Sequence, residues 1–144
     1  MKSITLTALA ALSLTAMFAV APASADMIAY KATLSGADEV PATKSKGTGS
    51  VVVTFDSTTK TLTWKGTYSG LTGTATGAHF HGPAEVGKVA GVAVPLPSAA
   101  SPLEGSAVLS DAQAADLKAG KLYLNVHTAA NPNGEIRGQV LHAE

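Results

Sequence analysis

Two histidines separated by a single residue are the feature of this sequence with the clearest chemical potential. His79 and His81 flank Phe80 in a segment that predicts a β-strand over 75–81. Because side chains alternate between the two faces of a strand, both imidazoles lie on one face and Phe80 on the other. With Phe80 in the core, the histidines face outward. Neutral imidazole is a ligand for copper, zinc, iron and nickel, so this spacing predicts a metal site.

A third histidine ends an alternating segment farther along the chain. The apolar residues of the stretch 122–126 occupy every second position, which predicts that they point inward. The opposite face then carries Tyr123, Asn125 and His127. Three histidines on one sheet surface make a good ligand set for a transition metal, and Tyr123 and Asn125 are placed to orient them.

Each histidine also has a simpler interpretation. A His-x-His pair in a strand is often solvated or hydrogen-bonded, and the ring of His127, which precedes a turn rich in Pro and Gly, can bond to loop backbone. His142 lies close to the C-terminus and is expected to be solvated. The pair and His127 together favour the metal site over these alternatives.

Four charged residues have both a functional and a structural interpretation. Glu135 and Arg137 alternate with Ile136 in a predicted strand, so they project outward and either orient a ligand histidine or form surface ion pairs. Asp38 and Glu39 form an acidic pair in a loop. Such a pair can bind a cation, but solvated loop charges are the expected arrangement.

The composition removes several classes of function. The chain has no cysteine, which excludes thiolate zinc sites, iron–sulfur clusters, cysteine nucleophiles and disulfides. Ten basic and ten acidic residues are spread without runs, so no cluster of Lys and Arg is available to bind nucleic acid. The common motifs of hydrolases, phosphate-binding loops, zinc proteases and calcium loops are absent from the sequence. No catalytic residue is therefore assigned.

The N-terminus is typical of an export signal. Lys2 precedes an uncharged apolar run over 4–20, and the small residues of the stretch 23–25 follow it. We expect cleavage to remove the signal peptide, residues 1–25, and to leave one domain over 26–144 in the periplasm or outside the cell. A retained membrane anchor is the alternative, but the apolar run is at the short end for spanning a bilayer. No membrane association is expected after cleavage.

The rest of the chain predicts an all-β fold. Short segments rich in β-branched residues alternate with Gly, Pro, Asn and Asp. A capping-box pattern that begins at Ser110, with a closing Gly120, predicts one short helix that crosses between strands. The series of short β segments predicts a β-sandwich or a barrel. The expected strands cover 27–34, 49–55, 61–68, 75–81, 89–96, 103–109, 121–127 and 135–141.

Four stretches together resemble the CHRD domain family, named from chordin. They are 34–41 (LSGADEVP), 78–84 (AHFHGPA), 122–128 (LYLNVHT) and 131–139 (NPNGEIRGQ), and the resemblance covers nearly all of 27–141. It implies an immunoglobulin-like Greek-key β-sandwich, similar to that of copper–zinc superoxide dismutase. That enzyme also presents a His-x-His strand pair to copper. The chain has no counterpart of the dismutase's zinc loop or cysteine pair, so the resemblance favours simple copper binding over dismutation.

Three functions follow as hypotheses. The first is an exported protein that binds copper, or alternatively zinc, through His79, His81 and His127, because imidazole sites favour copper among the divalent metals. The second is a dismutase-like or oxidase-like copper enzyme with an open coordination position. The third is a module that docks a protein or a polysaccharide without metal, as the presence of the domain in chordin suggests.

Overall fold

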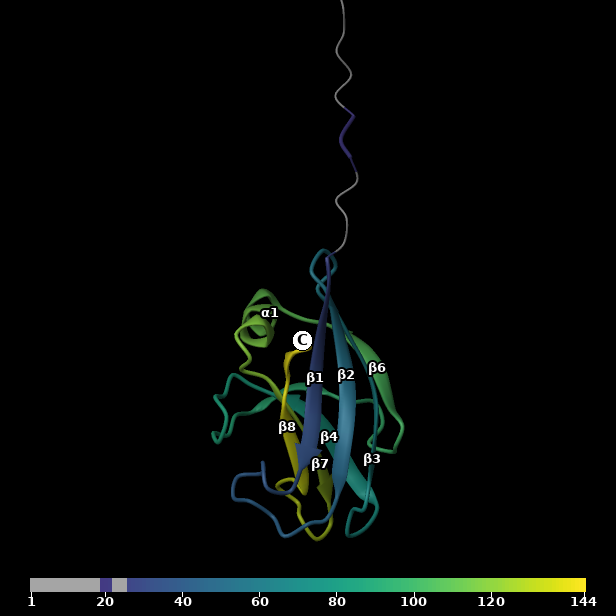
Figure 1. The fold of residues 1–144 in the computed structure, drawn as a ribbon, viewed down its shortest axis with the longest axis vertical. Helices are drawn as coiled ribbons and strands as arrows, with labels where there is room; N and C mark the ends of the chain where they lie inside the picture. Colours follow the sequence, from purple (N-terminus) through teal and green to yellow (C-terminus); the bar gives the residue numbers. More distant parts are fainter. Residues whose placement is uncertain (1–18, 22–25) are drawn as a thin grey trace, which may run out of the picture.

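The computed structural model describes residues 19–21 and 26–144 of the chain (Figure 1). Most of the predicted export signal, 1–25, lies outside the described residues. No helix within them is long and apolar enough to cross a membrane. Their elements, in chain order, are β1 (Met27–Ser35), β2 (Thr48–Asp56), β3 (Thr61–Ser69), β4 (Ala75–His81), β5 (Val92–Pro95), β6 (Leu103–Val108), α1 (Asp111–Lys118), β7 (Tyr123–Thr128), β8 (Ile136–Gln139) and β9 (Leu141–His142).

The strands form one strongly curved antiparallel sheet. Its order is β5-β4-β7-β8-β1-β2-β3-β6, and β9 pairs with β1. In Figure 1, β1, β2, β3 and β6 form the near layer, and β4 and β7 cross behind them. The predicted all-β class with one short helix is confirmed. The sheet places β4 and β7, the strands that carry the three candidate histidines, side by side.

The core lies between the two layers and is built by alternation along the strands. Trp64 of β3 and Phe80 of β4 meet in it edge to face, with ring centroids 5.3 Å apart. Both side chains are almost fully buried, as are the inward residues of the neighbouring strands. Burial of these aromatic and aliphatic side chains is the main stabilising contribution. The largest others are Tyr30, Leu34, Phe55, Leu62, Leu103, Leu117, Leu122, Leu124 and Ile136.

Helix α1 forms where the capping box predicts a helix. The Ser110 hydroxyl accepts a hydrogen bond from the Gln113 N–H, and the Gln113 side chain accepts one from the Ser110 N–H. Ala114 and Leu117 are the buried residues of the helix. Gly120 follows with a φ of 70°, the left-handed conformation that commonly ends a helix.

Two strands differ most from their predicted bounds. Pairing of β5 with β4 begins at Val92, so residues 82–91 form a loop instead of extending the strand from 89. The last strand breaks at Val140, whose buried side chain enters the core and whose N–H donates to the Leu122 carbonyl. The first difference matters for the site, because the loop 82–91 supplies backbone contacts to a candidate histidine.

Candidate metal centre

Strand register brings the three histidines together on the outer face of β4 and β7. Across this pair His79 faces Asn125, His81 faces Tyr123, and His127 faces Gly77. Phe80 is fully buried on the opposite face, as are the Leu124 and Val126 side chains of β7. The predicted direction of both strands is therefore confirmed.

The imidazole nitrogens lie within the reach of one metal ion. One ligand atom from each of His79, His81 and His127 lies within 4.8 Å of the others. His79 Nδ1 and His127 Nε2 are 3.0 Å apart. Two nitrogens bound to one ion at about 2.0 to 2.1 Å are separated by roughly 2.9 to 3.4 Å for angles between 90° and tetrahedral. The closest pair thus already has the spacing of two ligands on one ion.

Backbone carbonyls set the tautomers of two rings. His81 Nδ1 lies 3.0 Å from the Ala90 carbonyl oxygen, and His127 Nδ1 lies 2.9 Å from that of Pro132. Because a carbonyl oxygen only accepts, each Nδ1 carries the proton and each neutral ring keeps a lone pair on Nε2. This is the usual arrangement behind a metal-bound histidine.

The His81 ring has the strongest requirement for a partner. It is 8 % exposed, and its Nε2 is buried with no hydrogen-bond partner. A buried acceptor without a partner costs free energy, so such an atom in a folded protein calls for an explanation. A bound metal supplies one, whereas the hydrogen bond between His79 and His127 leaves His81 Nε2 without a partner.

Gly77 is a residue of the site that the sequence analysis missed. A Cβ at this position would lie 3.3 Å from His79 Cε1 and 3.5 Å from His79 Nε2. The absent side chain therefore leaves the space in which the His79 ring lies beside His127. The signal available in the sequence was a glycine two residues before a His-x-His pair, on the same strand face.

The environment favours neutral imidazole. Burial lowers the pKa of His79, and the neighbouring rings of His127 and His81 lower it further. Burial also lowers the pKa of His81, although contacts with the Ala90 carbonyl and the Asn125 side chain oppose this effect. A metal ligand must be deprotonated, so both shifts favour the form that binds metal.

Tyr123 and Arg137 support the loop that holds His81. The Tyr123 ring is parallel to the His81 ring, with an interplanar angle of 4° and a centroid separation of 4.9 Å. The Arg137 guanidinium lies 3.4 Å from the Tyr123 centroid and donates a 2.6 Å hydrogen bond to the Lys88 carbonyl. The Tyr123 hydroxyl accepts from the Ala90 N–H. The Tyr123 and Arg137 side chains thus hold the loop whose Ala90 carbonyl orients His81.

Glu39 is buried, in contrast to the solvated loop charge that the sequence led us to expect. It is 7 % exposed and sits beside Asn125, which is 2 % exposed. Burial raises the pKa of Glu39 to about 7, although Arg137 and the Asn125 side chain favour its ionised form. Desolvation outweighs this attraction because little of the Glu39 side chain remains in contact with water.

A small pocket adjoins the cluster and includes these buried polar groups. Its volume is about 380 Å³. His81 and His127 line it together with Glu39, Asn125 and Arg137. A molecule in this pocket would therefore touch both the histidine cluster and the buried carboxyl group.

Comparison with known proteins agrees with the sequence motifs. A family model described as the CHRD domain matches residues 30–140, a span that includes all three histidines. The chain belongs to the CHRD domain family. No curated protein and no solved structure gives a significant match. The fold and the histidine cluster of this CHRD domain are therefore described from its own structure.

Glu135 of the CHRD domain is fully buried, so the prediction that it projects outward is wrong. Its carboxylate accepts hydrogen bonds from the hydroxyls of Ser45, Thr72 and Thr128 and from the Thr72 N–H. Burial raises the pKa of Glu135, but these hydrogen bonds outweigh it and hold the pKa at about 2. The residue joins three segments of the chain, and none of its hydrogen bonds reaches a candidate ligand.

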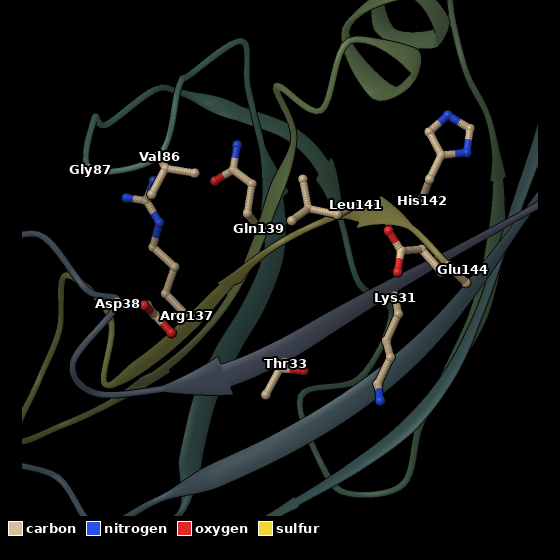
Figure 2. Close-up of a pocket in the computed structure, with 11 residues that line it drawn as sticks. Lys31, Thr33, Asp38, Val86, Gly87, Arg137, Gln139, Leu141, His142 and Glu144 are labelled. Carbon is tan, nitrogen blue, oxygen red and sulfur yellow. The ribbon is translucent and has the colours of Figure 1, made fainter.

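A larger groove lies on the other side of Arg137 (Figure 2). Its volume is about 770 Å³, and Lys31, Gln139 and His142 are among the residues that line it. Figure 2 shows the Arg137 side chain extending from β8 toward the Val86 segment. His142 stacks near the Tyr30 ring, with a centroid separation of 4.4 Å, and is not a member of the histidine cluster.

Proposed function

We propose that this CHRD domain is an exported metal-binding protein that holds one copper ion through His79, His81 and His127. The observation that carries the proposal is the convergence of three imidazoles, one of which has a buried and unpartnered Nε2. Hydrogen bonding among the rings alone would pair His79 with His127 and leave His81 unexplained.

The donor set favours copper over the other candidate ions. Three imidazole nitrogens suit copper and zinc, and affinity for a given nitrogen site is highest for copper(II) in the divalent series. Calcium and magnesium prefer oxygen ligands, and no carboxylate belongs to the cluster among the described residues. Zinc is the second choice, since three histidines with an open position also bind it.

The test is an equilibrium titration of the purified protein with copper(II) and with zinc(II). We expect one copper ion per chain and tighter binding of copper than of zinc. His79→Ala, His81→Ala and His127→Ala should each weaken copper binding strongly, because each removes one of three ligands. His142→Ala is the matched control and should change it little. Equal affinities for the wild type and His79→Ala would remove the proposed site.

A copper enzyme of the dismutase type is the second candidate. The pocket beside His81 and His127 supports it, because a bound ion with an accessible position can meet a small substrate. Consumption of superoxide by the copper-loaded protein separates this candidate from a protein that only binds the metal. If the copper-loaded protein consumes superoxide no faster than buffer alone does, the protein binds copper without dismutase activity.

A further inference from the structure

Three of the residues that line the pocket beside the histidine cluster carry a buried acceptor atom without a hydrogen-bond partner. Among the residues that the structure describes, five buried side-chain polar atoms lack a hydrogen-bond partner. Three of the five belong to residues that line this one pocket: His81 Nε2, Asn125 Oδ1 and Glu39 Oε1. Each of the three residues is more than nine-tenths buried. Since unpartnered buried polar atoms are rare and costly, their grouping points to a missing partner.

Each of the three atoms needs either a cation or a hydrogen-bond donor as its partner. Asn125 Oδ1 is an amide oxygen, and Glu39 Oε1 is a carboxylate oxygen when ionised. His81 Nε2 offers a lone pair, because its Nδ1 proton is donated to Ala90. The metal ion accounts for His81 Nε2 but leaves the two oxygens without partners.

Glu39 borders the pocket from outside the histidine cluster. It lines the same pocket as His81 and His127 but is not a member of the cluster within 4.8 Å. Gly134 leaves the space that the Glu39 and Asn125 side chains occupy, since a Cβ there would collide with Glu39 Oε1 and lie 2.7 Å from Asn125 Nδ2. With a φ of 124°, position 134 also has a backbone conformation that favours glycine.

Arg137 is the positively charged residue in the lining of the pocket. The Arg137 guanidinium lies over the Tyr123 ring and donates to the Lys88 carbonyl. Val40, Val89 and Pro132 supply apolar parts of the lining. The groups left without partners are therefore acceptors, which suit a small ligand with N–H or O–H protons better than an anion.

We propose that a small protic ligand, water in the resting protein, occupies this pocket at the open position of the metal ion and donates hydrogen bonds to Glu39 Oε1 and Asn125 Oδ1. This inference rests on the proposed metal site. It adds the chemical class of the ligand and assigns Glu39 and Asn125 as the residues that select it.

The test compares two ligands that differ at one nitrogen, which carries a hydrogen in imidazole and a methyl group in 1-methylimidazole. Imidazole and 1-methylimidazole are titrated into the copper(II)-loaded protein at pH 8, and electron paramagnetic resonance detects the fourth nitrogen on the ion. The wild type should prefer imidazole, whose N–H donates to Glu39. Glu39→Leu should weaken imidazole binding about tenfold or more, since a hydrogen bond to a buried charged acceptor is lost, and should abolish the preference. Glu39→Gln should restore part of it, and Glu104→Leu, at an exposed carboxylate of β6, is the matched control.

A second measurement needs no substitution at Glu39. Proton electron–nuclear double resonance on the copper-loaded wild type should detect strongly coupled protons that disappear in D₂O. Their presence supports a resting water on the ion, and their absence overturns the proposal.

The outcomes separate this inference from the metal site. Copper bound by three nitrogens with no response to either ligand leaves the proposed function standing and overturns the protic pocket. A preference for imidazole that persists in Glu39→Leu reflects size alone and also overturns it. Tighter binding of azide than of imidazole would show an anion site instead. Absence of any three-nitrogen copper signal overturns the proposed function and this inference with it.

Discussion

Gly77 faces His127 across the β4–β7 pair, and the His79 ring lies against the space that its missing side chain leaves. This relationship lets two histidines that do not share a cross-strand pair bring His79 Nδ1 and His127 Nε2 to 3.0 Å. The geometry of the cluster therefore depends on Gly77, which has no side chain and cannot itself be a ligand.

Gly77→Val should disturb the metal site without unfolding the domain. Valine suits a strand, but its side chain would press on the His79 ring, since even a Cβ lies 3.3 Å from Cε1. Changes behind metal-bound histidines typically cost about 10- to 100-fold in affinity, and a loss in that range is expected for copper. The control is Gly73→Val, where a Cβ would meet no atom within 4 Å. Copper titration and thermal unfolding of both variants make the comparison. Unchanged copper affinity in Gly77→Val would mean that the His79 ring does not need this space.

Glu135 should make the free energy of unfolding of the domain depend on pH in the acidic range. Its folded pKa of about 2 is below the ordinary value of 4.5, so the ionised carboxylate stabilises the fold fully above pH 4.5. That contribution is lost as pH falls from 4.5 toward 2. At pH 7 we expect Glu135→Gln to lower the free energy of unfolding by roughly 2 to 3 kcal/mol.

Chemical denaturation at a series of pH values measures the effect of Glu135. The wild type should lose stability between pH 4.5 and 2, and Glu135→Gln should follow a flatter curve in that interval. Glu104→Gln, at an exposed carboxylate, should keep the wild-type pH dependence. Parallel curves for the wild type and Glu135→Gln would contradict the assigned role of the buried carboxylate.

Phe80→Ala should strongly destabilise the fold. The side chain is fully buried and packs edge to face on Trp64. Loss of a buried phenylalanine ring costs about 3 to 5 kcal/mol, from lost burial and the cavity that remains. Val52→Ala, at a position that is 53 % exposed on β2, should change stability by only about 0.5 kcal/mol. Equilibrium unfolding of both variants is the measurement, and a loss below about 1 kcal/mol for Phe80→Ala would contradict its place in the core.

The proposed export signal predicts a shorter mature protein. Cleavage after Ala25 should yield a chain that begins at Asp26, because small residues precede this bond and an uncharged apolar run precedes them. Mass spectrometry of the protein from its native source measures the mature N-terminus. A chain that retains Met1 would contradict the signal.

Much of the fold and the core of the site could be predicted from local patterns. The strand over 75–81 was predicted with its observed bounds, because turn residues flank it and alternation puts Phe80 inside. The same alternation placed His127 on the face of the histidine pair. The capping box at Ser110 predicted the helix, since both of its hydrogen bonds form within four residues. These features depend on neighbours in sequence, and for that reason the sequence by itself determined them.

Tertiary structure alone decided what surrounds the histidines. Glu39 and Glu135 are charged residues that local pattern places at the surface, yet segments distant in sequence bury both. The loop 82–91 closes over His81 because Tyr123 and Arg137, which lie far along the chain, hold its backbone. Burial, hydrogen bonding and pKa are properties of the packed assembly of segments, and no periodicity along one segment encodes which distant segment covers it.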